Sequence, residues 1–258
     1  MTTGKKFTIV VLLALIAIGG GVLGWAIFAR RADLVVGGKN FTEQDLLSAM
    51  QTILLRKHFA EQSVDRLDGL GGTMVCFNAL RGGDGVVYAE YPGTGLVNIL
   101  KRDAIADPDQ TYDVVKKTFD QKYDLVWLKP FGFNNTYTLT MRRDQAARLG
   151  IQTISDLAAY VRRHEETQQG ERLEAGFNPE FMERPDGYKG LKEAYEFEFP
   201  KVFQMETGRM YKACQDKDVD VICAFATDGR IRAFDLRVLE DDRDFFPPYY
   251  AAPLVRKE

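Results

Sequence analysis

A run of 23 uncharged residues, Phe7–Ala29, constrains this chain more than any other feature. It is rich in Val, Leu, Ile, Ala and Gly, and a helix that crosses a bilayer needs about 20 such residues. A cleaved signal peptide has a shorter apolar stretch, of about 7–15 residues, and a small-residue cleavage site. No Ala-x-Ala precedes Arg30. The sequence therefore favours an uncleaved membrane anchor over a cleaved signal peptide, and either would export the rest of the chain.

The exported body is acidic. Residues 1–32 carry four basic residues and no acidic one, so the rest of this chain of net charge −3 carries −7. Nucleic acid is a poor candidate for the main partner, because phosphate binding usually requires a basic excess. With 45% apolar and 28% charged residues, the composition is that of a globular protein with a sizeable core.

Short apolar runs alternate with amphipathic segments from Asp33 onward, which is typical of an α/β protein. The run Leu34–Val36 predicts a buried strand. The helix expected next carries apolar residues at helical spacing, namely Leu46, Leu47, Met50, Ile53 and Leu54.

Two stretches, Asp103–Gln110 and Ala213–Thr227, have the composition expected where a chain crosses between lobes. We therefore expect residues 1–32 to form the anchor or signal segment. Residues 33–108 and 214–258 would form a first lobe and residues 109–213 a second, with a ligand cleft between them.

Signatures of catalysis and metal binding are missing from the sequence. It has no Gly-x-Ser-x-Gly, Walker loop or His-Glu-x-x-His motif, and only two histidines. Its three cysteines, Cys76, Cys214 and Cys223, fit no zinc spacing. Small buried thiols are favoured, and a Cys214–Cys223 disulfide remains the alternative. We expect no enzyme, no metal and no cofactor.

Glycine-rich and aromatic segments point instead to a binding site. Lys39 precedes a predicted helix start, where backbone N–H groups and a lysine can together hold an anion. Tyr91 and Thr94 lie at another predicted helix start. Arg184, in a turn-rich segment, is a forked donor suited to a carboxylate. Taken alone, each segment also fits an ordinary role: a solvated lysine, a core tyrosine or a surface arginine.

Taken together, these segments resemble the substrate-binding proteins of ABC importers for compatible solutes, the glycine betaine, choline and carnitine binders of the ProX, OpuC and OsmF type. The resemblance runs from about Leu34 to the end. Four motifs carry its first half: Gly-x-Lys-Asn-Phe-Thr-Glu-Gln at 37–44, Leu-Gly-Gly-Thr at 70–73, Glu-Tyr-x-Gly-Thr at 90–94 and Gly-Phe-Asn-Asn-Thr-Tyr at 132–137. Four more follow: Leu-Gly-Ile-x-Thr-Ile-Ser-Asp-Leu at 149–157, Arg-Pro-Asp-Gly at 184–187, Thr-Asp-Gly-Arg-Ile at 227–231 and Pro-Pro-Tyr-x-Ala-Ala-Pro at 247–253.

This resemblance implies a two-lobed periplasmic-binding-protein fold, type II-like, with the ligand in the cleft. It implies a receptor outside the cytoplasmic membrane that delivers a quaternary ammonium osmolyte, such as glycine betaine, to an ABC permease and its ATPase. By motif position it implies cage tyrosines at Tyr91, Tyr137 and Tyr249. Carboxylate donors are implied at Lys39, Thr94 and Arg184. A trimethylammonium group has no N–H to donate, so aromatic faces and dispersion must hold it.

The sequence departs from the family pattern in two places. Phe225 stands where several relatives have a fourth cage tyrosine. The phenylalanine keeps a π face but lacks the hydroxyl. Relatives usually continue for several tens of residues beyond the motif at 247–253, so a shortened first lobe is expected. A receptor for choline, carnitine or another small zwitterion remains an alternative, as do a non-transporting sensor and an extracellular enzyme on the same scaffold.

Overall fold

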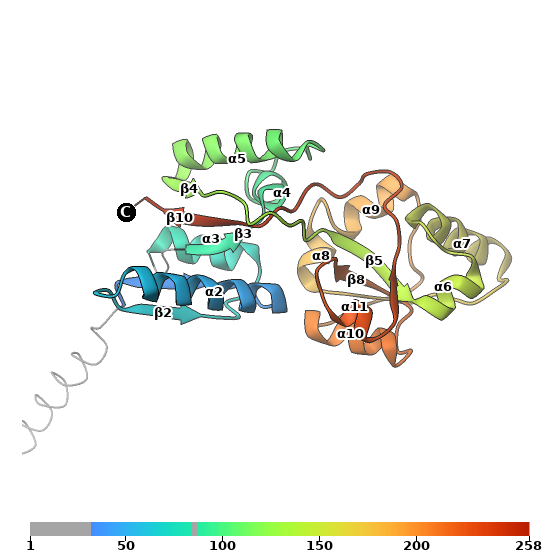
Figure 1. The fold of residues 1–258 in the computed structure, drawn as a ribbon. Helices are drawn as coiled ribbons and strands as arrows, with labels where there is room; N and C mark the ends of the chain where they lie inside the picture. Colours follow the sequence, from blue (N-terminus) through green and yellow to red (C-terminus); the bar gives the residue numbers. More distant parts are fainter. Residues whose placement is uncertain (1–31, 84–86, 258) are drawn as a thin grey trace, which may run out of the picture.

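The computed structural model describes residues 32–83 and 87–257. The anchor expected at residues 7–29 lies outside this part of the chain. Within the described residues, no helix combines the length and apolar character needed to cross a membrane. These residues form two α/β lobes, each built on a five-stranded sheet (Figure 1). The α/β class and the two-lobed architecture predicted from the sequence are confirmed.

The first lobe has the sheet order β2-β1-β3-β10-β4. Its strands are β1 (Leu34–Gly37), β2 (Val64–Leu67), β3 (Val87–Glu90), β4 (Leu125–Trp127) and β10 (Ala252–Arg256). Strand β1 pairs in parallel with β2 and β3, whereas β10 pairs antiparallel with β3 and β4. The helical segments are α2 (Thr42–His58), α3 (Thr73–Gly82), α4 (Pro92–Thr94), the π-helical turn η1 (Gly95–Ile99) and α5 (Pro108–Tyr123). Because strand ends meet at one sheet edge, the turns after β1 and β3 face the same side, toward the second lobe.

The second lobe has the sheet order β7-β6-β8-β5-β9. Its strands are β5 (Tyr137–Arg142), β6 (Ala175–Phe177), β7 (Val202–Gln204), β8 (Val221–Phe225) and β9 (Leu236–Val238). The helices are α6 (Arg143–Leu149), α7 (Ile154–Thr167), α8 (Pro179–Glu183), α9 (Tyr188–Tyr195), α10 (Thr207–Gln215) and α11 (Arg230–Ala233). The antiparallel register of β5 and β8 sets Tyr137 directly opposite Phe225. Two residues chosen from separate motifs thus become neighbours.

Two extended connections, between β4 and β5 and between β9 and β10, join the lobes (Figure 1). They run antiparallel to each other and form an isolated bridge between Asn134 and Tyr250. The N–H of Asn135 donates to the carbonyl of Tyr249 at 3.0 Å, which fixes the two connections side by side. We call these paired segments, residues 128–136 and 239–251, the hinge.

The crossing points differ from those expected near residues 108 and 214. Helix α5 and strand β4 stay with the first lobe, because β4 pairs with β10 at its sheet edge. Strand β8 stays with the second lobe, between β6 and β5. Both differences arise from strand pairing between segments distant in the sequence, which local composition does not report.

Helix α2 buries a different face from the expected one. Of its apolar residues at helical spacing only Leu47 is buried, whereas Leu46, Met50, Ile53 and Leu54 are each more than half exposed. The buried face carries Gln44, Leu47, Ser48, Gln51 and Thr52. The Gln44 amide donates to the carbonyl of Ala89 and to the hydroxyl of Tyr91, each at 3.0 Å. This polar face therefore orients a residue of the turn that follows β3.

All three cysteines are buried free thiols, as the sequence favoured. Burial raises the pKa of Cys76, Cys214 and Cys223 to about 12. At neutral pH they are therefore protonated, and they act as small apolar side chains in the core.

Candidate functional site

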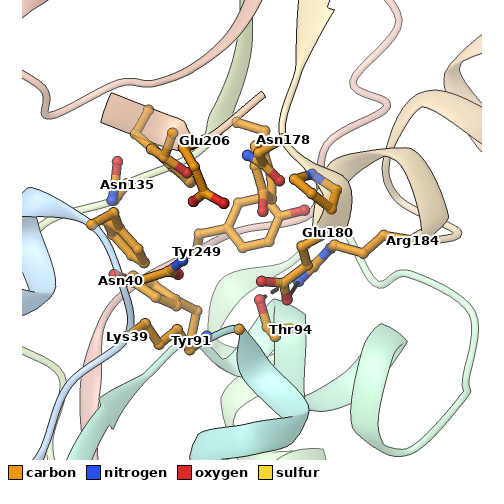
Figure 2. Close-up of a pocket in the computed structure, with 16 residues that line it drawn as sticks. Lys39, Asn40, Tyr91, Thr94, Asn135, Asn178, Glu180, Arg184, Glu206 and Tyr249 are labelled. Atoms are coloured by element: carbon orange, nitrogen blue, oxygen red, sulfur yellow. Dashed lines mark hydrogen bonds and ion pairs between the residues drawn. The ribbon is translucent and has the colours of Figure 1, made fainter. Parts of the chain in front are cut away.

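A cavity of about 150 Å³ lies between the lobes (Figure 2). Side chains from the first lobe, the second lobe and the hinge all line it. All seven site residues predicted from the sequence are among them: Lys39, Tyr91, Thr94, Tyr137, Arg184, Phe225 and Tyr249. The structure therefore brings together in one cavity residues spread over more than 200 positions of the chain.

Aromatic rings form a connected wall in this cavity. Tyr137 lies at its centre, with ring centroids 5.0 Å from Phe225 and 5.7 Å from Tyr249. Tyr91 meets Tyr249 edge-on at 6.5 Å. Phe41 stacks on Phe225 at 4.6 Å with an interplanar angle of 11°. The sequence reasoning missed Phe41, although it belongs to the motif at 37–44.

Local structure explains where these rings lie. Tyr91 directly follows β3 and precedes Pro92, which begins α4 with a fixed φ. Tyr137 is the first residue of β5 and Phe225 the last residue of β8. Tyr249 belongs to the hinge, so the wall has members on each part that would move if the lobes separated.

Lys39 reaches the cavity but is already neutralised within its own lobe. Its Nζ lies 2.6 Å from Oε1 of Glu90 and 2.9 Å from the Thr73 hydroxyl. Glu90 is fully buried and also accepts from the hydroxyl of Tyr88 and the N–H of Tyr91. The lysine expected to be a free anion donor is thus one half of a buried ion pair.

Arg184 is paired in the same way in the second lobe. Its guanidinium binds both carboxylate oxygens of Asp186, with Nε to Oδ1 at 2.8 Å. Asp186 also accepts from the hydroxyl of Tyr249 at 2.6 Å. Its Nη2, which also bonds Asp186, donates to the Thr94 hydroxyl of the first lobe at 3.2 Å, and its Nη1 approaches Glu180 at 3.4 Å. The guanidinium makes the forked contact expected of this arginine, but its partner is the carboxylate of Asp186.

The two cations also lie over rings of the aromatic wall. The guanidinium carbon of Arg184 is 5.4 Å from the ring centroid of Tyr137 and 5.8 Å from that of Tyr249. The Nζ of Lys39 is 5.1 Å from that of Tyr91. Each of the three tyrosine rings thus already interacts with positive charge.

Hydroxyl groups connect the two lobes directly. Glu43 of the first lobe accepts from Thr227 of the second at 2.5 Å and from Tyr91 at 2.6 Å. Arg230 of the second lobe donates to the Thr42 hydroxyl at 3.2 Å. Together with the contact between Arg184 and Thr94, these bonds hold the lobes closed on the cavity.

Six further polar residues line the cavity that the sequence reasoning did not single out as ligands: Asn40, Asn135, Asn178, Glu180, Glu206 and Thr207. Asn135 belongs to the motif at 132–137, which offered a signal. Glu180 and Glu206 lie where α8 and α10 begin, and no motif marked either as facing a cleft.

Glu180 is held ionised by its neighbours. Burial would raise its pKa, but Lys39, Arg184 and hydrogen bonds from Thr73 outweigh burial and keep it below its ordinary value of 4.5. Because the pKa is lower in the folded state than in the unfolded state, ionised Glu180 stabilises the fold above the unfolded pKa. That stabilisation is lost as the pH falls through the folded-state pKa.

We expect the Glu180→Gln variant to melt at a lower temperature than the wild type at pH 7, with the difference shrinking as the pH falls to about 3. Thermal unfolding of both proteins across this range measures it. Glu193→Gln, at an exposed position of α9 outside the cavity, removes the same charge and serves as control. A melting difference that does not depend on pH would contradict the assignment.

Comparisons with known proteins identify relatives of this chain. The family model for the substrate-binding domain of ABC-type glycine betaine transport systems, OpuAC, matches residues 32–258. A glycine-betaine-binding protein of Pseudomonas aeruginosa is 40% identical over 232 residues, covering 89% of this chain and 73% of that protein. The carnitine transport binding protein OpuCC of Listeria monocytogenes is 36% identical over 225 residues, covering 86% and 70%.

A solved structure shares the fold. It is described as a glycine betaine/carnitine/choline ABC transporter and is 32% identical, with a TM-score of 0.67. The similarity covers 86% of this chain and 79% of that one. The match extends over both lobes, so the two-sheet architecture is that of the periplasmic-binding-protein fold.

Proposed function

The chain belongs to the family of substrate-binding domains of ABC-type glycine betaine transport systems, and from this premise we propose that its cavity binds a quaternary ammonium solute. Like its relatives, it is a binding protein of this transport class and not an enzyme. Binding closes the lobes, and the closed form presents the solute to an ABC permease. Closure follows from the solute's greater affinity for the closed state.

The aromatic wall is the observation that carries this proposal. A quaternary ammonium cannot donate a hydrogen bond, so it is stabilised by ring faces at about 0.5–2 kcal/mol each. Tyr91, Tyr137, Tyr249 and Phe225 line the cavity together with Phe41. Several rings are therefore needed to approach the roughly −8 kcal/mol of micromolar binding. Phe225 contributes a ring face without a hydroxyl, and Phe41 backs that ring.

For a solute carboxylate we propose Lys39, Arg184 and Thr94 as partners, as the motifs implied, and add Asn135. Both cations are neutralised by buried carboxylates, so a solute carboxylate would share them with Glu90 and Asp186. This arrangement holds an anion more weakly than two unpaired cations would, because each attraction is offset by a nearby negative charge.

The site of action follows from the sequence of residues 1–31. We propose that the body lies outside the cytoplasmic membrane and that the apolar run at 7–29 anchors it there. Anchoring would keep the receptor close to the permease, which raises the effective concentration of one near the other.

Calorimetric titration tests the function directly. We expect the full 258-residue chain, in mild detergent, to bind glycine betaine, carnitine or choline with micromolar affinity and to give no heat with glycine. Glycine shares the carboxylate but lacks the methyl groups that fill an aromatic cage. Equal binding of glycine, or no binding of any quaternary ammonium by demonstrably folded protein, would contradict the proposal.

A further inference from the structure

The charges around the cavity do not balance. Four charged side chains line it, Lys39, Glu180, Arg184 and Glu206, and two buried carboxylates, Glu90 and Asp186, pair with the two cations. Two are positive and four are negative. Glu90 neutralises Lys39, and Asp186 neutralises Arg184, so the charges of Glu180 and Glu206 remain. A zwitterion such as glycine betaine has no net charge and would leave this excess in place.

Among the charged side chains that line the cavity, Glu206 is the one whose carboxylate has no protein partner within the described residues. It immediately precedes α10, yet its side chain does not cap that helix. In the part of the chain that the structure describes, its carboxylate makes no ion pair and no hydrogen bond, whereas its backbone carbonyl accepts from the N–H of Arg209 at 2.9 Å. Figure 2 shows its carboxylate turned into the cavity, from the side opposite Glu180. Unlike Glu180, which approaches Arg184 at 3.4 Å, it is available to a solute.

Asn135 gives a second, independent indication of a solute with several polar groups. It is 3% exposed and lines the cavity, and its Nδ2 has no hydrogen-bond partner. Its Oδ1 accepts from the N–H of Thr227 at 3.3 Å, which fixes the amide orientation. An unpaired buried donor is costly, so an acceptor that a solute brings within reach of this amide would be favoured.

We propose that Glu206 is a specificity residue that accepts a hydrogen bond from an O–H or N–H group of the solute. The preferred solutes are then quaternary ammonium compounds that carry such a donor, rather than glycine betaine, which has none. This inference rests on the proposed function, because the aromatic wall must first hold the ammonium group. Glu206 is exposed, so water satisfies its carboxylate when the solute has no donor, and a hydrogen bond from the solute adds the net preference of one such bond.

Two pairs of solutes isolate the hydroxyl group. Choline and n-propyltrimethylammonium differ in a hydroxyl in place of a methyl, and L-carnitine and γ-butyrobetaine differ by one hydroxyl. In both pairs the hydroxyl lies on the second carbon from the nitrogen. We expect the full chain to prefer the hydroxylated member of each pair by about fivefold in Kd, the effect of one hydrogen bond.

Variants at position 206 then assign the preference. In Glu206→Ala we expect the preference for the hydroxylated solutes to disappear, so that the ratio of Kd values is about one. The solutes without the hydroxyl, n-propyltrimethylammonium and γ-butyrobetaine, should bind as in the wild type. Glu206→Gln, which keeps one acceptor oxygen, should retain part of the preference. Glu193→Ala, which changes the net charge equally but lies outside the cavity, should leave it unchanged.

The possible outcomes are distinct. No preference in the wild type, or a preference that survives in Glu206→Ala, overturns the assignment of Glu206 and leaves the receptor function intact. Equal weakening of both members of each pair in Glu206→Ala would also overturn it, because Glu206 would then act by charge alone. Failure of all four solutes to bind folded protein would overturn the proposed function together with this inference.

Discussion

Replacing Tyr137 with alanine is expected to weaken the binding of glycine betaine or carnitine by roughly 100-fold. Tyr137 is the central ring of the aromatic wall, 5.0 Å from Phe225 and 5.7 Å from Tyr249. Its loss removes one cation–π face and the edge contacts that orient the other two rings. At about 1–2 kcal/mol for the face and about 1 kcal/mol for the ring pairs, the sum approaches the 2.7 kcal/mol of a 100-fold change.

The measurement is a calorimetric titration of the variant below its melting temperature. Tyr137→Phe should bind nearly as the wild type does, because the ring face remains. Phe199→Ala removes a buried ring of the same lobe that does not line the cavity, so it controls for lost stability. If Tyr137→Ala binds as tightly as Phe199→Ala does, the cage assignment is wrong.

Replacing Arg184 with methionine is expected to destabilise the protein by about 3–5 kcal/mol, because it leaves Asp186 buried without its counter-ion. Asp186 is 3% exposed, and Arg184 bonds both of its oxygens. Only the Tyr249 hydroxyl would remain to stabilise the negative charge. Urea unfolding, followed by circular dichroism in the far ultraviolet, measures the change in the free energy of unfolding.

The double variant Arg184→Met/Asp186→Asn removes both charges and should regain most of this stability. It also separates folding from binding. If Arg184 helps to hold a solute carboxylate, the folded double variant should lose affinity for glycine betaine and keep it for choline, which has no carboxylate. A double variant no more stable than Arg184→Met would show that the ion pair is not the cause, and unchanged betaine affinity would remove Arg184 from the carboxylate site.

The sequence predicted the members of the site better than their interactions. The motifs placed Lys39, Tyr91, Tyr137 and Arg184 in a common cleft, and the structure brings them together. They did not reveal that Glu90 and Asp186 would neutralise the two cations. Those partners lie 51 and two residues away, and their pairing depends on how β3 and the turn before α9 are oriented in three dimensions.

The fold shows the same division. The class followed from the alternation of apolar runs with amphipathic segments, but this alternation did not predict β2 (Val64–Leu67), β6 (Ala175–Phe177) or β9 (Leu236–Val238). In β2, three of the four residues are exposed. Helix α2 has an apolar stripe that predicts burial, yet it buries its polar face, which bonds Ala89 and Tyr91. Here specific hydrogen bonds to β3 and to the residue after it outweigh periodicity, and a pattern count does not include them.

No ion pair joins the two lobes anywhere in residues 32–83 and 87–257: Lys39 is matched inside the first lobe and Arg184 inside the second. The lobes are held together by hydroxyl contacts such as Thr227 to Glu43, and by ring stacking. Dissolved ions weaken the attraction between separated charges strongly but affect hydrogen bonds at contact distance and ring stacking much less. The salt concentration should therefore have little effect on the opening of the lobes. A receptor for osmolytes built in this way would keep its affinity while the salinity around the cell changes.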